Sequence, residues 1–400
     1  MKIGIIKERK SPPDRRVVLS PRACQIVKEK FPNAEILIEP SPIRVFSDQA
    51  YRDAGFELTD NMDQCDVLLG VKEVPIEALI PNKKYFFFSH TIKKQAYNRD
   101  LLRAVLDLNI ELYDHEVITN ESGQRLVAFG RYAGIVGAYN GIRTYGLKYD
   151  LYDLPKAETL SGIDSLISAL KEINLPNIKI VVSGKGRVSG GVQEILDAMG
   201  IKEVGVTDYL NKSFEHAVYC QIEVLDYNKR LDGKKGSIPD FYKNPQHYQS
   251  DFMRFAQCSD LYIAGHFYAD GAPYLYTRDQ VKLDNFKIKV VADISCDIDG
   301  PVATTIRPST IADPIYGYDP VLEQETDYKN PDAIAVMAVD NLPCEIPSNA
   351  SEGFGESFID HVIPSLFNQD KNGVLQRARM TTAGKLTKRY NYLQDYVDEK

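Results

Sequence analysis

Two series of short apolar segments, each followed by helical stretches, constrain the fold of this chain more than any other feature. The first series contains KIGIIK, AEILIEP, DVLLGVK, KYFFFSH and IELYDHE. The second begins at Asn177 with NIKIVVSG and continues through KEVGVTDY, DLYIAGHF, IKVVADIS and AIAVMAVD. Strands that alternate with helices form mostly parallel sheets with both faces covered. The sequence therefore predicts an α/β protein with two Rossmann-like parallel-sheet domains.

The helical segments between the two series define the predicted domains. VAFGRYAGIVGAYNGIRTYGLKYD carries small residues at helical spacing, which indicates a helix packed closely against its neighbours and able to bridge two lobes. We predict a discontinuous first domain, 1–138 plus 346–400, that holds the substrate. The second domain, 139–345, is predicted to bind a nucleotide and to contain an insertion near 210–255. The active site is expected in a cleft between the two domains.

Composition excludes several other classes of protein. A hydrophobic content of 44% and a charged content of 26% are ordinary for a globular chain. No apolar run approaches the roughly 18 residues of a membrane span, and the run in MKIGIIKERK is a first strand, too short for a signal peptide. The net charge is −8 and the basic residues are scattered, which argues against nucleic-acid binding.

The cysteines indicate a reducing compartment. The chain has 6 of them, far apart, and none forms a CxxC pair. A disulfide scaffold would cluster them and a structural zinc site would pair them. We therefore expect buried or half-buried thiols, no metal, and a cytoplasmic location.

A Gly-rich turn in the second series predicts a dinucleotide site. In IVVSGKGRVSGG, Gly184 and Gly186 lie between a strand and a helix, which is the context that a GxG fingerprint requires. Gly184 is expected to form the tight turn, and Gly186 to let the backbone approach a pyrophosphate. Arg187 and Val188 open the helix and join the predicted cofactor site. Ser189 replaces the third glycine of the pattern.

An acidic residue further along favours NAD over NADP. Asp208 lies about 20 residues beyond Gly186, and we place it at the end of the next strand, KEVGVTDY. A carboxylate there accepts both ribose hydroxyls and repels a 2′-phosphate. The alternative is a tight βα turn that binds no ligand.

Ionisable residues follow the strands of the first series. Lys72 and Glu73 end DVLLGVKE, His90 ends KYFFFSH, Glu116 ends IELYDHE, and Arg16 precedes a helix start. The carboxyl ends of parallel strands gather at one edge of a sheet, where ligands bind. These residues are expected to form a catalytic cluster, although each alone is also typical of a surface or structural residue.

The same segments resemble a known family. RVVLSP, VKE, FFFSHTIKKQ and RLVAFGRYAG are similar to lysine-forming saccharopine dehydrogenases and to the lysine–2-oxoglutarate reductase half of bifunctional lysine-degrading enzymes. Both belong to the superfamily of alanine dehydrogenase and transhydrogenase. DFYKNPQHYQSDF, VVADISCDIDG and VDNLPCEIPSNAS extend the resemblance over nearly the whole chain. It implies a reversible reaction of saccharopine, NAD and water to lysine, 2-oxoglutarate and NADH.

The resemblance also implies roles for individual residues. Those that act on the substrate are an acid–base pair, two acids that tune it, and three cations that bind carboxylates: Lys72 and His90; Glu73 and Glu116; Arg16, Lys93 and Arg125. Those that bracket the nicotinamide follow later strands: Asp293, Asn341, Leu342 and Pro343. A lysine can deprotonate the secondary amine near neutral pH when burial or a neighbouring cation lowers its pKa. Histidine suits the hydrolysis of the resulting imine.

Several positions depart from the family pattern. GKGRVSGG is more similar to the reductase halves, many of which use NADPH, whereas Asp208 favours NAD. Ser348 and Asn349 stand where relatives often carry an arginine and an acid, and His266 lies where relatives vary, so it is assigned no role.

Three alternatives therefore stay open. They are an NADPH-dependent lysine–2-oxoglutarate reductase, an alanine dehydrogenase-like enzyme, and a non-catalytic sensor of lysine or NAD. SHTIKKQ argues against the second, because an alanine site needs a more apolar loop. The expected partners are lysine, 2-oxoglutarate and saccharopine, with no nucleic acid and no membrane.

Overall fold

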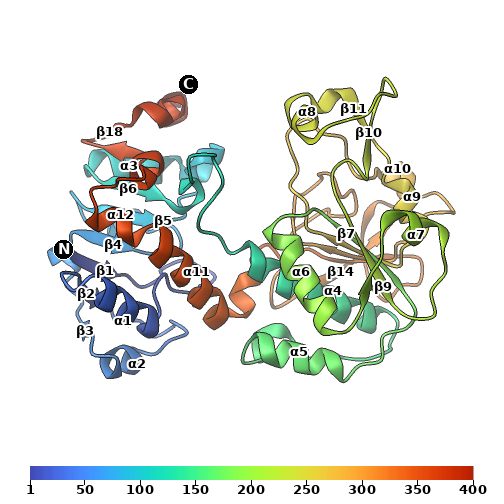
Figure 1. The fold of residues 1–400 in the computed structure, drawn as a ribbon, viewed down its shortest axis with the longest axis horizontal. Helices are drawn as coiled ribbons and strands as arrows, with labels where there is room; N and C mark the ends of the chain where they lie inside the picture. Colours follow the sequence, from blue (N-terminus) through green and yellow to red (C-terminus); the bar gives the residue numbers. More distant parts are fainter. Residues whose placement is uncertain (400) are drawn as a thin grey trace. The chain divides into compact units, whose positions relative to one another are not determined.

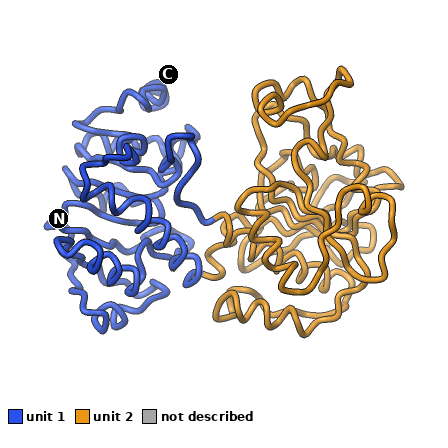
Figure 2. Tube along the Cα trace, viewed as in Figure 1, with its two compact units in different colours: residues 1–129, 347–400 blue, residues 130–346 orange. Residues whose placement is uncertain are grey.

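The structure, a computed structural model, describes residues 1–399 and divides into two compact units (Figure 2). Unit 1 comprises residues 1–129 and the chain from Pro347 onward, and unit 2 comprises residues 130–346. The predicted boundary at residue 138 falls inside helix α4 (Gly130–Lys148), which lies wholly in unit 2. Within the described residues, no helix combines the length and the apolar character that crossing a membrane would need.

A six-stranded parallel sheet forms the centre of unit 1 (Figure 1). Its order is β3-β2-β1-β4-β5-β6. The strands are β1 (Lys2–Ile5), β2 (Glu35–Ile38), β3 (Glu57–Leu58), β4 (Val67–Leu69), β5 (Lys84–Phe87) and β6 (Glu111–Asp114). All except β3 lie within predicted segments, and β3 has only 2 residues, too few for a recognisable pattern.

Helices cover both faces of this sheet, as the prediction requires. Alternate strand residues enter opposite cores: Ile36 and Ile38 pack in one, and Leu37 in the other. The first helix begins where expected, because Ser20 caps it and Pro21 opens it. The helices of unit 1 are α1 (Pro21–Lys30), α2 (Asp48–Asp53), α3 (Arg99–Asp107), α11 (Pro347–His361), α12 (Ile363–Phe367), α13 (Val374–Ala378) and α14 (Gln394–Asp398), and a small hairpin joins β17 (Thr381–Thr382) to β18 (Lys385–Leu386).

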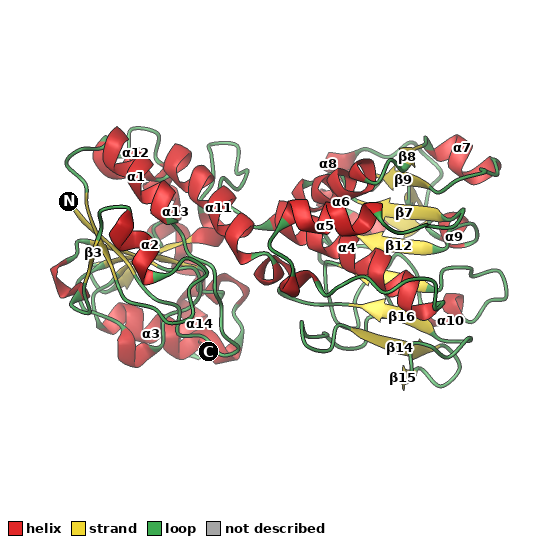
Figure 3. Cartoon of the chain, turned by 90° about the horizontal axis from the view of Figure 1, so that it is seen from below, coloured by secondary structure: helices red, strands yellow, loops and turns green. Residues whose placement is uncertain are grey.

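Unit 2 is built on an eight-stranded mixed sheet, whose strands lie side by side in Figure 3. Its order is β15-β14-β16-β13-β12-β7-β9-β8, and β14 runs antiparallel to both of its neighbours. The strands are β7 (Lys179–Ser183), β8 (Lys202–Glu203), β9 (Val218–Ile222), β12 (Leu261–Ala264), β13 (Val290–Asp293), β14 (Ile315–Asp319), β15 (Gln324–Thr326) and β16 (Ile334–Met337). A separate antiparallel pair contains β10 (Asn228–Arg230) and β11 (Tyr248–Ser250).

The predicted glycine-rich helix α4 packs closely against α6 (Arg187–Ala198). A Cβ atom on Gly134 would lie 1.8 Å from the carbonyl oxygen of Val188, and one on Gly191 would lie 2.0 Å from that of Arg131. Only glycine permits backbones to approach so closely at these points. The other helices of this unit are α5 (Ile163–Lys171), α6 (Arg187–Ala198), α7 (Val206–Asn211), α8 (Ile238–Lys243), α9 (Met253–Ala256) and α10 (Arg278–Val281).

Two segments of unit 2 differ from the prediction. KEVGVTDY forms only the short edge strand β8 and then the helix α7, in which Tyr209 is buried. The strand beside β7 is β9, which lies in the segment that we interpreted as an irregular insertion. β9 is only 5 residues long, mixes apolar and polar side chains, and lies between long polar segments. Such a pattern is too weak to distinguish a buried strand from a loop.

Candidate active site

Neighbouring strands of unit 1 bring the predicted ionisable residues to one edge of its sheet. β1, β4, β5 and β6 are adjacent, and their carboxyl ends lead to Glu8, Lys72, His90 and Glu116. In a parallel sheet these ends share one edge. The structure therefore gathers residues that lie far apart in the sequence.

Lys72 and His90 form a close pair. The Nζ atom of Lys72 lies 3.4 Å from Nε2 of His90. Burial lowers the pKa of Lys72, and the charges of Arg16 and Lys10 lower it further. Burial also lowers the pKa of His90, followed by the charge of Lys72. The lowered pKa of Lys72 makes its neutral, proton-accepting form more accessible than that of an isolated lysine, and the lowered pKa of His90 favours the neutral imidazole.

Two carboxylates flank the imidazole ring of His90. Glu73 Oε2 lies 3.9 Å from Nε2, and Glu116 Oε2 lies 3.9 Å from Nδ1. Both oxygens are buried, and neither has a hydrogen-bond partner within residues 1–399. Burial alone would raise the pKa of Glu73, but the hydrogen bond from Lys10 at 2.7 Å helps to lower it overall. A proton on His90 would therefore meet a carboxylate on each side.

His90 has an unusual backbone conformation. Its φ angle is 54°, in the left-handed region, and it immediately precedes the short 3-10 helix η3 (Thr91–Lys93). This region is uncommon for residues other than glycine, although histidine is enriched there. The ring of Phe88 stacks on the imidazole with centroids 6.1 Å apart. Tertiary packing therefore fixes a side chain whose backbone alone would favour other conformations.

The three predicted carboxylate-binding cations occupy different environments. Arg16 is only 3% exposed, and its Nε and Nη2 atoms donate to Asp14 at 3.0 and 2.6 Å. Arg125 is exposed, and its Nη2 lies 3.6 Å from Glu116 Oε1. Lys93 is exposed in η3. The structure therefore brings Arg125 close to Glu116 in the acid–base cluster. The guanidinium of Arg16 instead donates two of its hydrogen bonds to Asp14.

The sequence reasoning missed Glu8. Its side chain is half-buried and accepts the backbone N–H groups of Val71 at 2.7 Å and Lys72 at 2.8 Å. Burial raises the pKa of Glu8 to about 7. The contact holds the chain where Lys72 leaves the sheet. Glu8 follows the end of β1, so the strand-end rule that found the other residues could have found it too.

The Gly-rich turn of unit 2 has the geometry of a phosphate site. Gly184 has φ +95°, and a Cβ there would lie 2.7 Å from the carbonyl oxygen of Gly265. Gly186 begins α6 and has open space where a Cβ would lie. Gly186 provides no side-chain cap, and exposed Arg187 and half-buried Val188 form the first turn of α6. The N-terminus of a helix favours an anion, so these residues fit the phosphates of a dinucleotide.

Asp208 does not lie at a strand end. It belongs to α7, is half-buried, and pairs with Lys212 one turn later at 2.9 Å. The predicted placement was wrong because the strand beside β7 is β9. The residue after β9 is Glu223, and the N–H of Gly184 donates to the carbonyl of Ile222 at 2.8 Å. The dinucleotide fingerprint requires an acidic residue at the end of the strand beside β7. In this chain that residue is Glu223, not Asp208.

The residues predicted to bracket the nicotinamide are mostly buried. Asp293 ends β13 and accepts hydrogen bonds from Ser295, Cys296 and Thr305, with distances of 2.6 to 3.1 Å. Burial raises the pKa of Asp293. Its carboxylate therefore shapes the loop after β13.

The later loop lies beside α4. Leu342 is buried, and a Cβ on Gly137 of α4 would lie 3.4 Å from its Cδ1 atom. Asn341 is half-buried at the start of the 3-10 helix η8 (Leu342–Glu345). Glu345 Oε1 accepts a hydrogen bond from Asn140 of α4 at 2.8 Å. This contact joins the loop to the helix.

Glu345 gives a prediction about stability and pH. Burial raises its pKa from 4.5 to about 7. The folded state therefore binds a proton more tightly than the unfolded state, and stability falls as the pH rises from the lower value to the higher. Replacing Glu345 with glutamine, which mimics the neutral acid, is expected to stabilise the chain by up to about 3 kcal/mol near pH 8 but by less than about 1 kcal/mol near pH 5. Thermal melting at the two pH values measures this, and equal shifts at both would contradict it.

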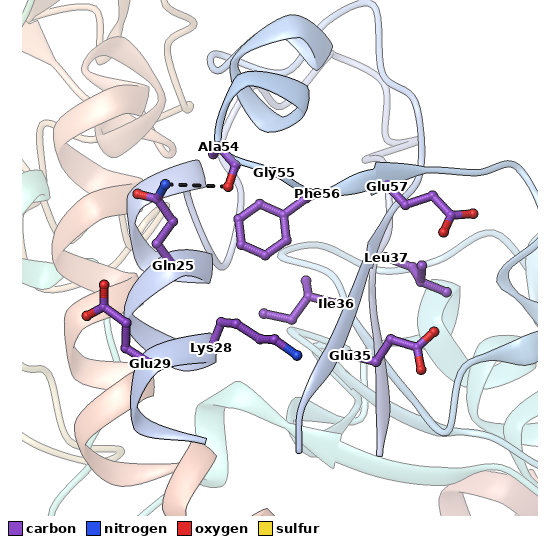
Figure 4. Close-up of a pocket in the computed structure, with 10 residues that line it drawn as sticks. All are labelled: Gln25, Lys28, Glu29, Glu35, Ile36, Leu37, Ala54, Gly55, Phe56 and Glu57. Carbon is purple, nitrogen blue, oxygen red and sulfur yellow. Dashed lines mark hydrogen bonds between the residues drawn. The ribbon is translucent and has the colours of Figure 1, made fainter. Parts of the chain in front are cut away.

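A surface pocket of about 560 Å³ lies elsewhere in unit 1 (Figure 4). α1 contributes Gln25 and Lys28 to it, and Glu35 lines it at the amino end of β2. The acid–base residues follow the carboxyl ends of strands, at the other edge of the sheet. This pocket is therefore separate from the candidate active site.

Comparison with known proteins defines the class of this fold. Residues 4–136 match the family model described as "Alanine dehydrogenase/PNT, N-terminal domain". The chain is similar in structure to an L-alanine dehydrogenase, with a TM-score of 0.68, 17% identity and coverage of 100% of this chain and 99% of the other. A transhydrogenase from Sinorhizobium meliloti matches with a TM-score of 0.56, 14% identity and coverage of 97% and 99%. Residues 4–136 are thus similar to the N-terminal domain of this family, and the whole chain shares the fold of alanine dehydrogenase and transhydrogenase.

Sequence relatives confirm the resemblance to saccharopine dehydrogenases and lysine-degrading enzymes. The alpha-aminoadipic semialdehyde synthase of Arabidopsis thaliana is 27% identical over 98% of this chain and 41% of its own length, and that of Mus musculus 28% over 95% and 46%. The chain spans about half the length of these relatives. The saccharopine dehydrogenase [NAD(+), L-lysine-forming] of Yarrowia lipolytica is 24% identical over 86% of this chain and 87% of its own.

Proposed function

We propose that this chain interconverts saccharopine, NAD and water with lysine, 2-oxoglutarate and NADH. The observation that carries the proposal is the Lys72–His90 pair, 3.4 Å apart with both pKa values lowered. Such a pair suits a reaction that deprotonates an amine and then hydrolyses an imine. The similarity to a lysine-forming saccharopine dehydrogenase over most of both chains supports the same reaction.

Each member of the pair has a distinct task in this proposal. Neutral Lys72 removes the proton from the secondary amine of saccharopine, which frees the nitrogen lone pair. A bound nicotinamide supplies the hydride acceptor. His90 then takes a proton from the water that attacks the imine and later protonates the departing amine. Glu73 and Glu116, each 3.9 Å from an imidazole nitrogen, stabilise the imidazolium that forms between these steps.

The substrate carboxylates are proposed to bind nearby cations. Arg125, beside Glu116, and Lys93, in η3, are exposed, so charge-assisted hydrogen bonds with a ligand are possible. Arg16 is held by Asp14, and its charge lowers the pKa of Lys72. We assign Arg16 both a contact to a carboxylate and this electrostatic effect on the base.

NAD is proposed to bind the Gly-rich turn of unit 2. Gly184, Gly186, Arg187 and Val188 would hold the pyrophosphate, with Asp293, Asn341 and Leu342 shaping the nicotinamide end. Glu223 takes the ribose role that the sequence suggested for Asp208. A carboxylate beside the turn accepts ribose hydroxyls and repels the 2′-phosphate of NADP.

Exchange of Glu223 tests the cofactor preference. Glu223→Ala is expected to weaken NADH binding about tenfold, because a hydrogen bond to a charged group is lost. The ratio of the NADPH and NADH dissociation constants should therefore become smaller. Asp208→Ala, the matched control in α7, should leave both affinities unchanged. Fluorescence titration of each cofactor measures this. If only Asp208→Ala weakened NADH binding, the ribose contact would be assigned to Asp208 instead of Glu223.

The reaction itself is tested by NADH oxidation with purified protein, lysine and 2-oxoglutarate, with NADPH in a parallel assay. Absorbance loss that requires both lysine and 2-oxoglutarate supports the proposal. Activity with pyruvate and ammonia instead would indicate an alanine dehydrogenase. No turnover with any of these substrates, together with retained lysine or NADH binding, would favour the sensor.

The second candidate is an NADPH-dependent lysine–2-oxoglutarate reductase. It is favoured by the similarity of nearly the whole chain to less than half of the semialdehyde synthases. A faster reaction in the NADPH assay would select it. The proposed location is the cytoplasm, supported by six free thiols.

A further inference from the structure

Two exposed aromatic side chains of unit 2 have no role in the proposed reaction. Phe267 is 75% exposed and lies just beyond β12, and Tyr242 is 45% exposed in α8. Their ring centroids are 6.3 Å apart, with the rings tilted by 46°. Removing the apolar surface of a phenylalanine from water is favourable. Most of the Phe267 ring is therefore available for contact with a ligand.

The strand order places Phe267 beside the Gly-rich turn. β12 and β9 flank β7, so Phe267 and Glu223 follow the two strands on either side of Gly184. The segment before Phe267 touches the turn directly, since a Cβ on Gly184 would lie 2.7 Å from Gly265 O and 3.0 Å from His266 Cα. Phe267 thus stands at the same edge of the sheet as the proposed phosphate and ribose contacts.

Tyr242 also lies near the ribose acid. Burial raises the pKa of Tyr242, and the charge of Glu223 raises it further. The hairpin and helix that carry Tyr242 follow β9 in the chain, and the N–H of Glu223 donates to the Asp226 carboxylate at 2.7 Å in the intervening turn. An acid and two aromatic rings therefore border one region next to the turn.

We propose that Tyr242 and Phe267 form a stacking surface for the adenine ring of the dinucleotide. An adenine linked to a ribose at Glu223 lies within reach of both rings, and an aromatic face suits a purine because stacking needs no directional partner. The proposal rests on dinucleotide binding, as does the proposed function, but not on the identity of the amino acid substrate. A protein partner for the same rings is an outcome of the test below.

The test compares ligands that contain or lack adenine. Phe267→Ala and Tyr242→Ala are expected to weaken binding of NADH and of ADP-ribose about tenfold each. Binding of reduced nicotinamide mononucleotide, which lacks adenine, should not change. Phe267→Trp should retain the affinity for all three. Isothermal titration with the full chain gives each dissociation constant, and circular dichroism verifies folding.

Tyr149→Ala is the matched control. Tyr149 is 42% exposed at the end of α4, and its pKa responds to Asp260, which precedes the amino end of β12. It therefore presents a similar ring at the opposite edge of the sheet. Unchanged ADP-ribose affinity in both test variants would overturn the proposal, as would an equal loss for the mononucleotide or a change only in oligomeric state. Tight NADH binding without lysine-dependent turnover would reject the proposed reaction and leave the stacking surface intact.

Discussion

Lys72→Met is expected to lower turnover about a thousandfold while NADH binding survives. General-base catalysis contributes roughly 10²–10⁴ in rate, and methionine retains most of the volume of the side chain without its amine. Lys72 lies in unit 1, whereas the Gly-rich turn lies in unit 2, so the cofactor contacts are not altered directly. The variant therefore separates chemistry from cofactor binding.

Steady-state rates with saturating lysine and 2-oxoglutarate, and a parallel NADH titration, provide the measurement. Lys30→Met is the matched control, because Lys30 is an exposed lysine at the end of α1 with only a loose ion pair to Asp360, 3.6 Å away. It should retain wild-type turnover. Full activity in Lys72→Met would remove this lysine from the mechanism.

Gly191→Ala is expected to destabilise unit 2 by about 3 kcal/mol, the upper end of the usual cost of overpacking. Its new Cβ would lie 2.0 Å from the carbonyl oxygen of Arg131, so α4 and α6 would have to separate. The adjacent Gly190 is exposed in the same helix, with nothing within 4 Å of a Cβ. Gly190→Ala should instead stabilise the chain by about 0.5–1 kcal/mol, because alanine favours the helix.

Chemical denaturation followed by circular dichroism compares the two alanine variants with the wild type. The two changes add the same methyl group to the same helix, one residue apart, so helix propensity cancels in their difference. Equal stability of the two variants would show that α4 and α6 do not pack as closely as described.

The elements predicted correctly from the sequence are those whose structure depends on a single local pattern. Apolar strands such as IVVSG and a capped helix start at Ser20 carry their own signal, and strand-end position alone predicts that Lys72, His90 and Glu116 lie at one edge of the sheet. Distances within that cluster, and the engagement of Arg16 by Asp14, depend on tertiary packing that no local pattern contains.

The errors in unit 2 arose from strand order. The chain visits the edge strand β8 before it returns to β9 beside β7, so the next acid along the sequence was not the next acid in space. Asp208 and Glu223 both satisfied the chemistry, and only the pairing of β7 with β9 distinguishes them. Sequence spacing alone could not supply that pairing.

The discontinuity of unit 1 has a consequence for how the chain folds during synthesis. Its six strands are translated first, but Phe354 and Phe358, which pack in the same core as Ile3 and Phe86, are translated only after all of unit 2. Until α11 leaves the ribosome, this face of the first sheet is covered only in part, by α1 and α2, and the remaining apolar strand surface favours aggregation. Unit 2, contiguous in the chain, can complete its own core earlier. The domain made first is thus the last to finish folding.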